Sequence, residues 1–236
     1  MAGGRRFRGL LVDYGGVLTT SVGASFAAFC VESGVHPERL KEVIAEAYGD
    51  GGSENMIARV ERGALSTRAF ERWLAATLSE GLPEPVRAAG LRRRLFTMER
   101  DAAMTAAVRT AHRSGVKTAL VSNTWGTPLT LPRRVQDGLF DAVLRSDEVG
   151  MRKPDPEIYL LAAERLDIVP GACVFVDDLA QNVDGARAVG MEGIVHRSAE
   201  FTIPKLEGLF GLSLAADAAR WADPKRGAPE TKSKNR

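Results

Sequence analysis

The stretch Leu10-Leu11-Val12-Asp13-Tyr14-Gly15-Gly16-Val17-Leu18 decides how the rest of this chain is interpreted. Its apolar, branched first residues predict a buried strand over residues 7–12. The strand ends at Asp13, and the two glycines that follow permit a tight turn and a close approach of backbone amides to a ligand. Open α/β sheets bind their ligands at this end of their strands. Such an aspartate coordinates a cation, attacks an electrophile or only caps a turn, and the stretch alone leaves these alternatives open.

The composition is that of an ordinary globular protein. The 236 residues are 44% hydrophobic and 26% charged, with a formal net charge of +2, which gives no strong case for nucleic acid or an anionic membrane. No apolar run is long enough to span a bilayer, and the basic residues 1–8 are not followed by a secretory apolar core. The two cysteines suggest no disulfide framework. We therefore expect a cytoplasmic protein that binds neither nucleic acid nor a membrane.

Residues 19–100 carry helical patterns and no convincing strand. Helices are expected at 22–32, from 37 through 47, at 53–62, after the N-cap Ser66 and at 83–95. We interpret this segment as a helical domain inserted between the first strand and the rest of the chain.

After residue 100, strands and helices alternate. Strands are expected at 117–121, 142–145, 172–176 and 193–196, and helices at 101–114, 132–139, 155–166 and 180–189. This order predicts a doubly wound α/β fold, in which a parallel sheet is covered on both faces and the carboxyl ends of its strands share one edge. The predicted domains are an α/β core of residues 1–18 and 101–212, a helical domain of residues 19–100, and a disordered tail at 223–236.

Polar side chains follow several of these strands at that shared edge. They are Asp13, Ser122 and the pair Asp177-Asp178, and Lys153 lies in a loop before the helix that starts at residue 155. A carboxylate nucleophile, a hydroxyl, an ammonium and paired carboxylates fit together around a phosphoryl group. Asp13 and one of the paired acids can hold Mg²⁺, and adjacent acids repel each other unless a cation lies near.

In these residues the chain resembles the haloacid dehalogenase-like hydrolase superfamily, from Phe7 to about Leu206. The family's four motifs are matched in order by residues 13–18, by Ser122-Asn123, by Lys153 within residues 152–156, and by Asp177-Asp178 with Asn182. The helical insertion is similar to the small cap domain that closes over the site in this family and helps to choose substrates. The resemblance implies a small phosphorylated substrate, whose identity the sequence does not reveal.

The resemblance implies a role for each motif residue in the chemistry. Asp13 would attack phosphorus and form an aspartyl-phosphate, which water then hydrolyses. Ser122 and Lys153 would hold the phosphoryl group. Asn123 and Gly16 are candidate substrate-binding residues, although Asn123 stabilises the turn after Ser122 in an equally good interpretation.

The resemblance also implies a Mg²⁺ site. Its protein ligands would be a carboxylate oxygen of Asp13, the backbone carbonyl of Gly15 and the carboxylate of Asp178. Asp177 and Asn182 would support these ligands without binding the metal directly.

The sequence departs from the family at Gly15. Phosphatases of the superfamily usually carry at this position a second Asp, which protonates the leaving group and then activates water. General acid–base catalysis typically contributes a rate factor of about 10²–10⁴. Three outcomes are open: slow turnover of alkyl phosphates, a preference for good leaving groups, or partial substitution by Thr19, Thr20 or a group of the substrate.

Three alternative functions follow from the same residues. A 2-haloacid dehalogenase also uses an Asp nucleophile but needs no metal, and the Asp177-Asp178 pair argues against it. A phosphosugar mutase depends on the missing acid. A non-catalytic protein that binds a phosphorylated ligand would explain Gly15, but not the retention of every other motif. An apolar face of the inserted helices would support a homodimer.

Overall fold

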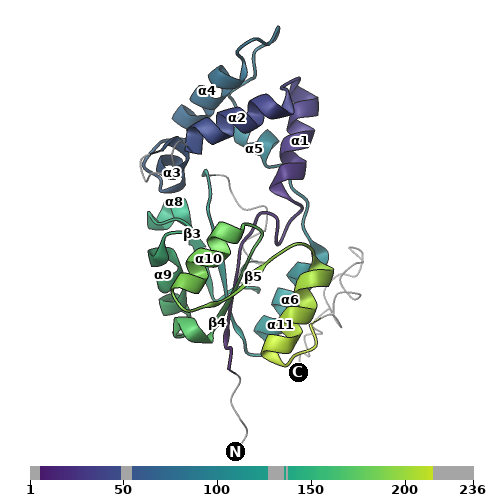
Figure 1. Cartoon of the computed structure of the whole chain (residues 1–236), viewed down its shortest axis with the longest axis vertical. Coiled ribbons are helices and arrows are strands. Elements are labelled where there is room, and N and C mark those ends of the chain that lie inside the picture. Colours follow the sequence, from purple (N-terminus) through teal and green to yellow (C-terminus); the bar gives the residue numbers. More distant parts are fainter. Residues whose placement is uncertain (1–5, 49–54, 127–135, 137, 215–236) are drawn as a thin grey trace, which may run out of the picture.

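The computed structural model of the chain describes residues 6–48, 55–126, 136 and 138–214. Its helices α1–α5 gather at one end of the molecule, and the strands with helices α6 and α9–α11 form the other end (Figure 1). None of the helices in these described ranges is long and apolar enough to cross a membrane. The predicted tail at 223–236 lies outside the described residues.

Five parallel strands form the sheet, in the order β3-β2-β1-β4-β5. They are β1 (Gly9–Val12), β2 (Lys117–Ser122), β3 (Ala142–Arg145), β4 (Cys173–Asp177) and β5 (Glu192–Val195). The central strand β1 pairs with both β2 and β4, and Val12 lies opposite Leu120 and Val176. This register brings the residues that follow the three strands to one edge. The doubly wound parallel fold predicted from the sequence is confirmed.

Helices cover both faces of this sheet because side chains alternate along each strand. Leu10 and Val12 point to the face packed by α6 (Ala102–Arg113) and α11 (Ala199–Phe210). Leu11 points to the face packed by α9 (Pro156–Leu166) and α10 (Ala180–Ala188). Both faces of the sheet are therefore dry, and the edge formed by the carboxyl ends of the strands is open to ligands.

The helical unit, as we call residues 21–96, has an apolar core of its own. It contains α1 (Val22–Ser33), α2 (Pro37–Tyr48), α3 (Met56–Glu61), α4 (Thr67–Leu78) and α5 (Leu91–Leu95). Residues such as Phe29, Phe70 and Leu74 are completely buried in it. The predicted cap at Ser66 is present, since its hydroxyl accepts a hydrogen bond from the amide of Ala69. The division into domains at residues 19 and 100 stays a prediction.

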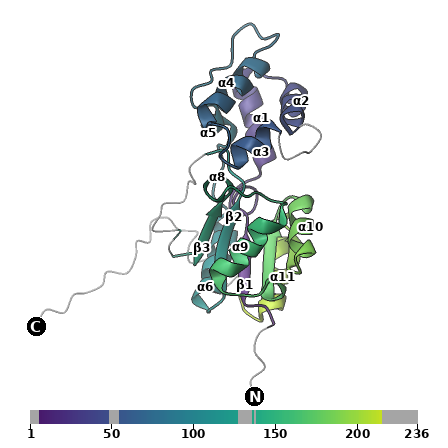
Figure 2. The same ribbon diagram turned by 90° about the vertical axis from the view of Figure 1, so that its left-hand side faces the viewer.

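Two adjacent segments connect the helical unit to the sheet. Thr19 and Arg100 form an isolated antiparallel bridge. The amide of Thr20 donates to the carbonyl of Glu99 at 2.8 Å, and the amide of Asp101 donates to the carbonyl of Leu18 at 2.9 Å. The entry and the exit of the helical unit are thus held together by backbone hydrogen bonds, and Figure 2 shows the helical unit above the sheet.

The predicted helix at 83–95 is wrong for most of its length. Only α5 is helical there, because Pro83 and Pro85 lack amide donors and Gly90 adopts a left-handed backbone with φ of 73°. The short helix α8 (Ser146–Val149) and the helix α11 were not predicted. Most of the helix expected at 132–139 lies outside the described residues.

Asp155 lies at the N-cap position of α9, where an aspartate commonly accepts a hydrogen bond from the first turn of the helix. The carboxylate of Asp155 makes no capping hydrogen bond to that helix. It instead accepts from Arg62 of the helical unit at 2.5 Å. An ion pair between the two halves of the molecule has replaced the local cap.

Candidate active site

The sheet edge brings together the residues expected there from the sequence. Asp13 directly follows β1, Ser122 is the last residue of β2, and Asp177 is the last residue of β4. Lys153 comes from the loop between α8 and α9, and its side chain is 1% exposed. Asp13, Ser122, Lys153 and Asp178 all line one cavity at this edge.

Lys153 lies between two carboxylates. Its Nζ donates to Oδ1 of Asp13 at 2.5 Å and to Oδ2 of Asp177 at 2.6 Å. Desolvation by burial acts to lower the pKa of this ammonium, but the attraction of Asp13 and Asp177 outweighs it and raises the pKa. The lysine therefore stays charged, which its predicted role of holding a phosphoryl oxygen requires.

Asp177 is fixed by several donors besides the lysine. Its Oδ1 accepts from the amide of Leu179 at 2.9 Å, and both of its oxygens lie 3.1 Å from the side-chain nitrogen of Asn182. A carboxylate held by this many N–H groups is suited to orienting Lys153. This arrangement agrees with the supporting role expected for Asp177 and Asn182, which stays a prediction.

Three carboxylates converge beside Lys153. One oxygen of each of Asp13, Asp177 and Asp178 lies within 4.8 Å of the others. Burial raises the pKa of Asp13 to about 7 even though Lys153 acts to lower it. Burial and the charge of Asp177 raise the pKa of Asp178 to about 6. A single ammonium thus does not compensate the charges of the three carboxylates. Their oxygens are hard donors that fit a Mg²⁺ ion, and its two positive charges would complete the compensation.

Glycine is required at position 16 next to this cluster. Gly16 has a left-handed backbone with φ of 77°, and a Cβ atom added there would overlap the carboxylate of Asp178. Gly15 differs, because its φ is not left-handed. A Cβ atom at position 15 would lie 3.2 Å from Cγ2 of Val22 and 4.0 Å from Oδ2 of Asp13. The position of the missing acid thus faces Asp13, with modest crowding.

Asn123 clamps the backbone of Lys153. Its side-chain Oδ1 accepts from the amide of Lys153 at 2.9 Å, and its Nδ2 donates to the carbonyl of Lys153 at 2.9 Å. The neighbouring Ser122 hydroxyl is buried and donates to the carbonyl of Asn123 over a long 3.4 Å. Asn123 therefore positions Lys153, a contact that neither sequence interpretation of Asn123 included.

Glu61 is a site residue that the sequence analysis missed. It ends α3 in the helical unit and is 3% exposed. Its Oε2 accepts from Arg152 at 2.5 Å and from Asn123 at 3.4 Å, and its Oε1 accepts from the indole of Trp125 at 3.2 Å. One signal was present: Glu61 lies four residues after the buried Ile57, on the same face of the helix.

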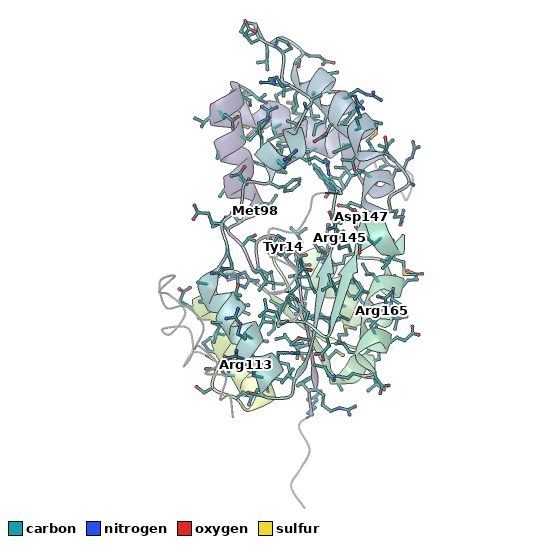
Figure 3. The ribbon with its side chains drawn as sticks, turned by 180° about the vertical axis from the view of Figure 1, so that it is seen from behind. Tyr14, Met98, Arg113, Arg145, Asp147 and Arg165 are labelled. Atoms are coloured by element: carbon teal, nitrogen blue, oxygen red, sulfur yellow. The ribbon has the colours of Figure 1, made fainter. Side chains whose placement is uncertain are left out.

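The cavity between the sheet edge and the helical unit has a volume of about 430 Å³. Both halves of the molecule line it. Figure 3 labels two of its lining residues, Tyr14 from the turn after β1 and Met98 from the segment after α5. A volume of this size is in the range of small-molecule sites.

Comparisons with known proteins support one family. The family model described as haloacid dehalogenase-like hydrolase matches residues 7–190. A mouse (Mus musculus) protein named acyl-CoA dehydrogenase family member 10 is 29% identical over 90% of this chain, but the matched part is only 20% of that protein. The sesquiterpene phosphatase astK of Aspergillus oryzae is 33% identical over 56% of this chain and 68% of its own length.

A solved structure shares the fold. It is the enzyme bt-2542 of Bacteroides thetaiotaomicron in complex with magnesium and inorganic phosphate, with a TM-score of 0.58 and 20% sequence identity. The match covers 81% of this chain and 94% of that one. At this identity the likeness supports the fold and not the substrate.

Proposed function

We propose that this chain, which belongs to the haloacid dehalogenase-like hydrolase family, is a Mg²⁺-dependent phosphatase of small phosphomonoesters. The observation that carries the proposal is Lys153, buried between Asp13 and Asp177 beside the third carboxylate of Asp178. This arrangement has the charges that a phosphoryl group and a divalent cation need. A relative named as a phosphatase and a fold neighbour holding magnesium and phosphate support the proposal.

In the proposed reaction Asp13 is the nucleophile. Lys153 occupies Oδ1, and we assign the attack on phosphorus to Oδ2. The bond from phosphorus to the leaving-group oxygen breaks, and an aspartyl-phosphate forms. Water then attacks this intermediate and releases inorganic phosphate. Ser122 Oγ and Lys153 Nζ hold the phosphoryl oxygens throughout.

The proposed metal ligands are Asp13, Asp178 and the carbonyl of Gly15. Asp177 and Asn182 would support these ligands without binding the metal directly. When bound, Mg²⁺ supplies positive charge that neutralises the phosphoryl oxygens. The chain's own contribution is to hold the carboxylates together and to exclude bulk water beneath the helical unit.

Removal of the metal is expected to stop phosphate release from acetyl phosphate. EDTA should lower the rate at least about 10²-fold, because a metal ion typically contributes several kcal/mol of transition-state stabilisation. Added Mg²⁺ should restore the rate.

Mg²⁺ should also raise the melting temperature, more at pH 8 than at pH 5.5. Protons compete for Asp13 and Asp178 below their pKa values of about 7 and 6, and metal binding needs the deprotonated groups.

Each alternative predicts a different result in this experiment. A 2-haloacid dehalogenase releases halide from a 2-haloacid in the presence of EDTA and gains no stability from Mg²⁺. A non-catalytic binding protein gains stability from Mg²⁺ with phosphate but turns over no acetyl phosphate. Either result would replace the phosphatase proposal.

Gly15→Asp is expected to raise turnover of alkyl phosphates while changing acetyl phosphate little. A carboxyl at this position faces Asp13 and can protonate a poor leaving group, a step worth about 10²–10⁴ in enzymes that evolved it. We expect a gain of at least about tenfold with propyl phosphate. The measurement is kcat/KM for both compounds.

Gly15→Asn is the matched control, because it has the same shape and cannot donate a carboxyl proton. Val22→Ala in both backgrounds removes the 3.2 Å contact that crowds position 15. An equal gain with Asn, or no gain with Asp in the Val22→Ala background, would contradict the explanation by a missing acid.

The remaining expectations stay predictions. They are the cytoplasmic location, the absence of nucleic-acid and membrane partners, and a homodimer.

A further inference from the structure

The cavity above Asp13 is polar at one end and mostly apolar at the other. Its polar end lies at the sheet edge and includes Asp13, Ser122 and Lys153. The opposite end is formed by the helical unit and the adjoining segments, and its lining is mostly apolar. The apolar lining residues there are Val22, Phe26, Ile44, Phe96, Met98 and Trp125. A ligand whose phosphoryl group reached Asp13 would place its organic group against them.

The aromatic part of this lining is fixed by ring contacts. The ring centroids of Phe26 and Phe96 are 5.7 Å apart, and those of Phe96 and Trp125 are 5.0 Å apart with the planes at 85°. The buried Phe70 also packs against Trp125, with the ring centroids 5.0 Å apart. Edge-to-face contacts of this kind hold the rings in place. The apolar end of the cavity is therefore a preformed surface. It binds apolar groups because water is released from this surface and from the bound group.

The charged residues above the polar end compensate each other. Glu61 and Arg152 line the cavity and form an ion pair at 2.5 Å, and both are buried. The remaining charged residues in the described part of the lining are Asp13, Lys153 and Asp178, all at the phosphoryl end. A second charge on the organic group would lose its hydration and meet no counterion there.

We propose that the substrates are phosphomonoesters of apolar, uncharged alcohols and phenols, whose organic group fills the pocket formed by the helical unit. The proposal rests on the proposed function for the phosphoryl end and on the lining for the organic end. Tyr48 adds a hydroxyl to the part of the lining that comes from the helical unit, and burial raises the pKa of that phenol to about 12, so it stays neutral. The organic end thus favours carbon over the hydroxyl groups of a sugar.

The test compares phosphate esters that differ only in the organic group. Methyl, propyl and hexyl phosphate and glucose 6-phosphate are all monoesters of primary alcohols, so the same type of bond is broken. Each is measured as a competitive inhibitor of acetyl phosphate hydrolysis, which gives its affinity even if its own turnover is slow. Affinity should rise about fourfold per buried methylene, and hexyl phosphate should bind at least about tenfold more tightly than glucose 6-phosphate.

Two variants locate the effect in the pocket. Ile44→Gln places an amide in the apolar wall and should lower the ratio of hexyl phosphate affinity to glucose 6-phosphate affinity at least about tenfold. Val31→Gln is the matched control, since Val31 is 87% exposed on the same helical unit and does not line the cavity. It should leave both affinities and the acetyl phosphate rate unchanged.

Failure of this inference is distinct from failure of the proposed function. If acetyl phosphate is hydrolysed but glucose 6-phosphate binds as well as hexyl phosphate, the phosphatase stands and the apolar substrate class is wrong. If acetyl phosphate is not hydrolysed, the phosphatase proposal fails. Calorimetric titration of the Mg²⁺-loaded protein with hexyl phosphate and with glucose 6-phosphate then tests the pocket by binding alone, and equal affinities would overturn the inference.

Discussion

Replacement of Asp13 by Asn is expected to lower phosphate release from acetyl phosphate at least about 10³-fold, because an amide cannot form the covalent intermediate. The substitution keeps the size of the side chain and an oxygen that can accept from Lys153, so the fold should be preserved. The measurement is the steady-state rate at saturating Mg²⁺, with the melting temperature as a check on folding.

A second readout separates loss of the nucleophile from a general defect. Wild-type protein mixed with acetyl phosphate that is labelled in its phosphoryl group and quenched in acid should retain label. Hydroxylamine should release this label, because it cleaves acyl phosphates. Asp13→Asn should retain none. Asp184→Asn is the matched control, since its carboxylate is exposed on α10 and pairs with Arg187. Label that persists in Asp13→Asn would show that another residue is the nucleophile.

Lys153→Met is expected to lower turnover about 10²–10³-fold and to destabilise the metal-free protein. The loss of rate follows from removing a preorganised positive charge at the phosphoryl oxygens. The loss of stability follows from leaving Asp13 and Asp177 buried without their shared cation, since breaking a buried pair costs about 3–5 kcal/mol. Urea denaturation and phosphate release measure the two effects.

The sign of the pH dependence provides a further test of the Lys153 variant. Without the ammonium the pKa of Asp13 should rise above its wild-type value of about 7. The folded variant then binds more protons than the unfolded chain between pH 4 and that raised pKa, so its unfolding free energy falls as pH rises through this window. The deficit relative to wild type should be larger at pH 8 than at pH 5. Lys41→Met, at a lysine that is 77% exposed, is the control and should show no such dependence.

The sheet and its polar edge were predictable because the residues that form them lie at the ends of strands. A buried apolar run that stops at Asp13 or at Asp177 marks both the strand and the place of its carboxylate. Parallel pairing then brings residues that are over 100 positions apart to the same edge. The edge positions of Asp13 and Asp177 needed no more than this topology, whereas Lys153 comes from a loop between α8 and α9.

The contacts between the two halves were not predictable in the same way. Glu61 belongs to a short helix with no motif, and its partners Arg152 and Trp125 come from loops whose paths depend on the tertiary fold. Asp155 is a second example. Its position in the sequence favours a local helix cap, but its carboxylate pairs with Arg62 of the helical unit instead. A long-range ion pair leaves almost no local signature in the sequence, whereas the end of a strand leaves a clear one.

If the proposed reaction holds, the position of Glu61 would make discrimination between substrates act on kcat as well as on KM. Glu61 belongs to the helical unit, yet it contacts Asn123, and Asn123 clamps the backbone of Lys153. In the proposed reaction, a substrate too bulky to fit beneath the helical unit would displace Glu61 and loosen Lys153, which we propose holds the phosphoryl group. Such a compound would be captured and then converted slowly, so discrimination against it would occur in the chemical step.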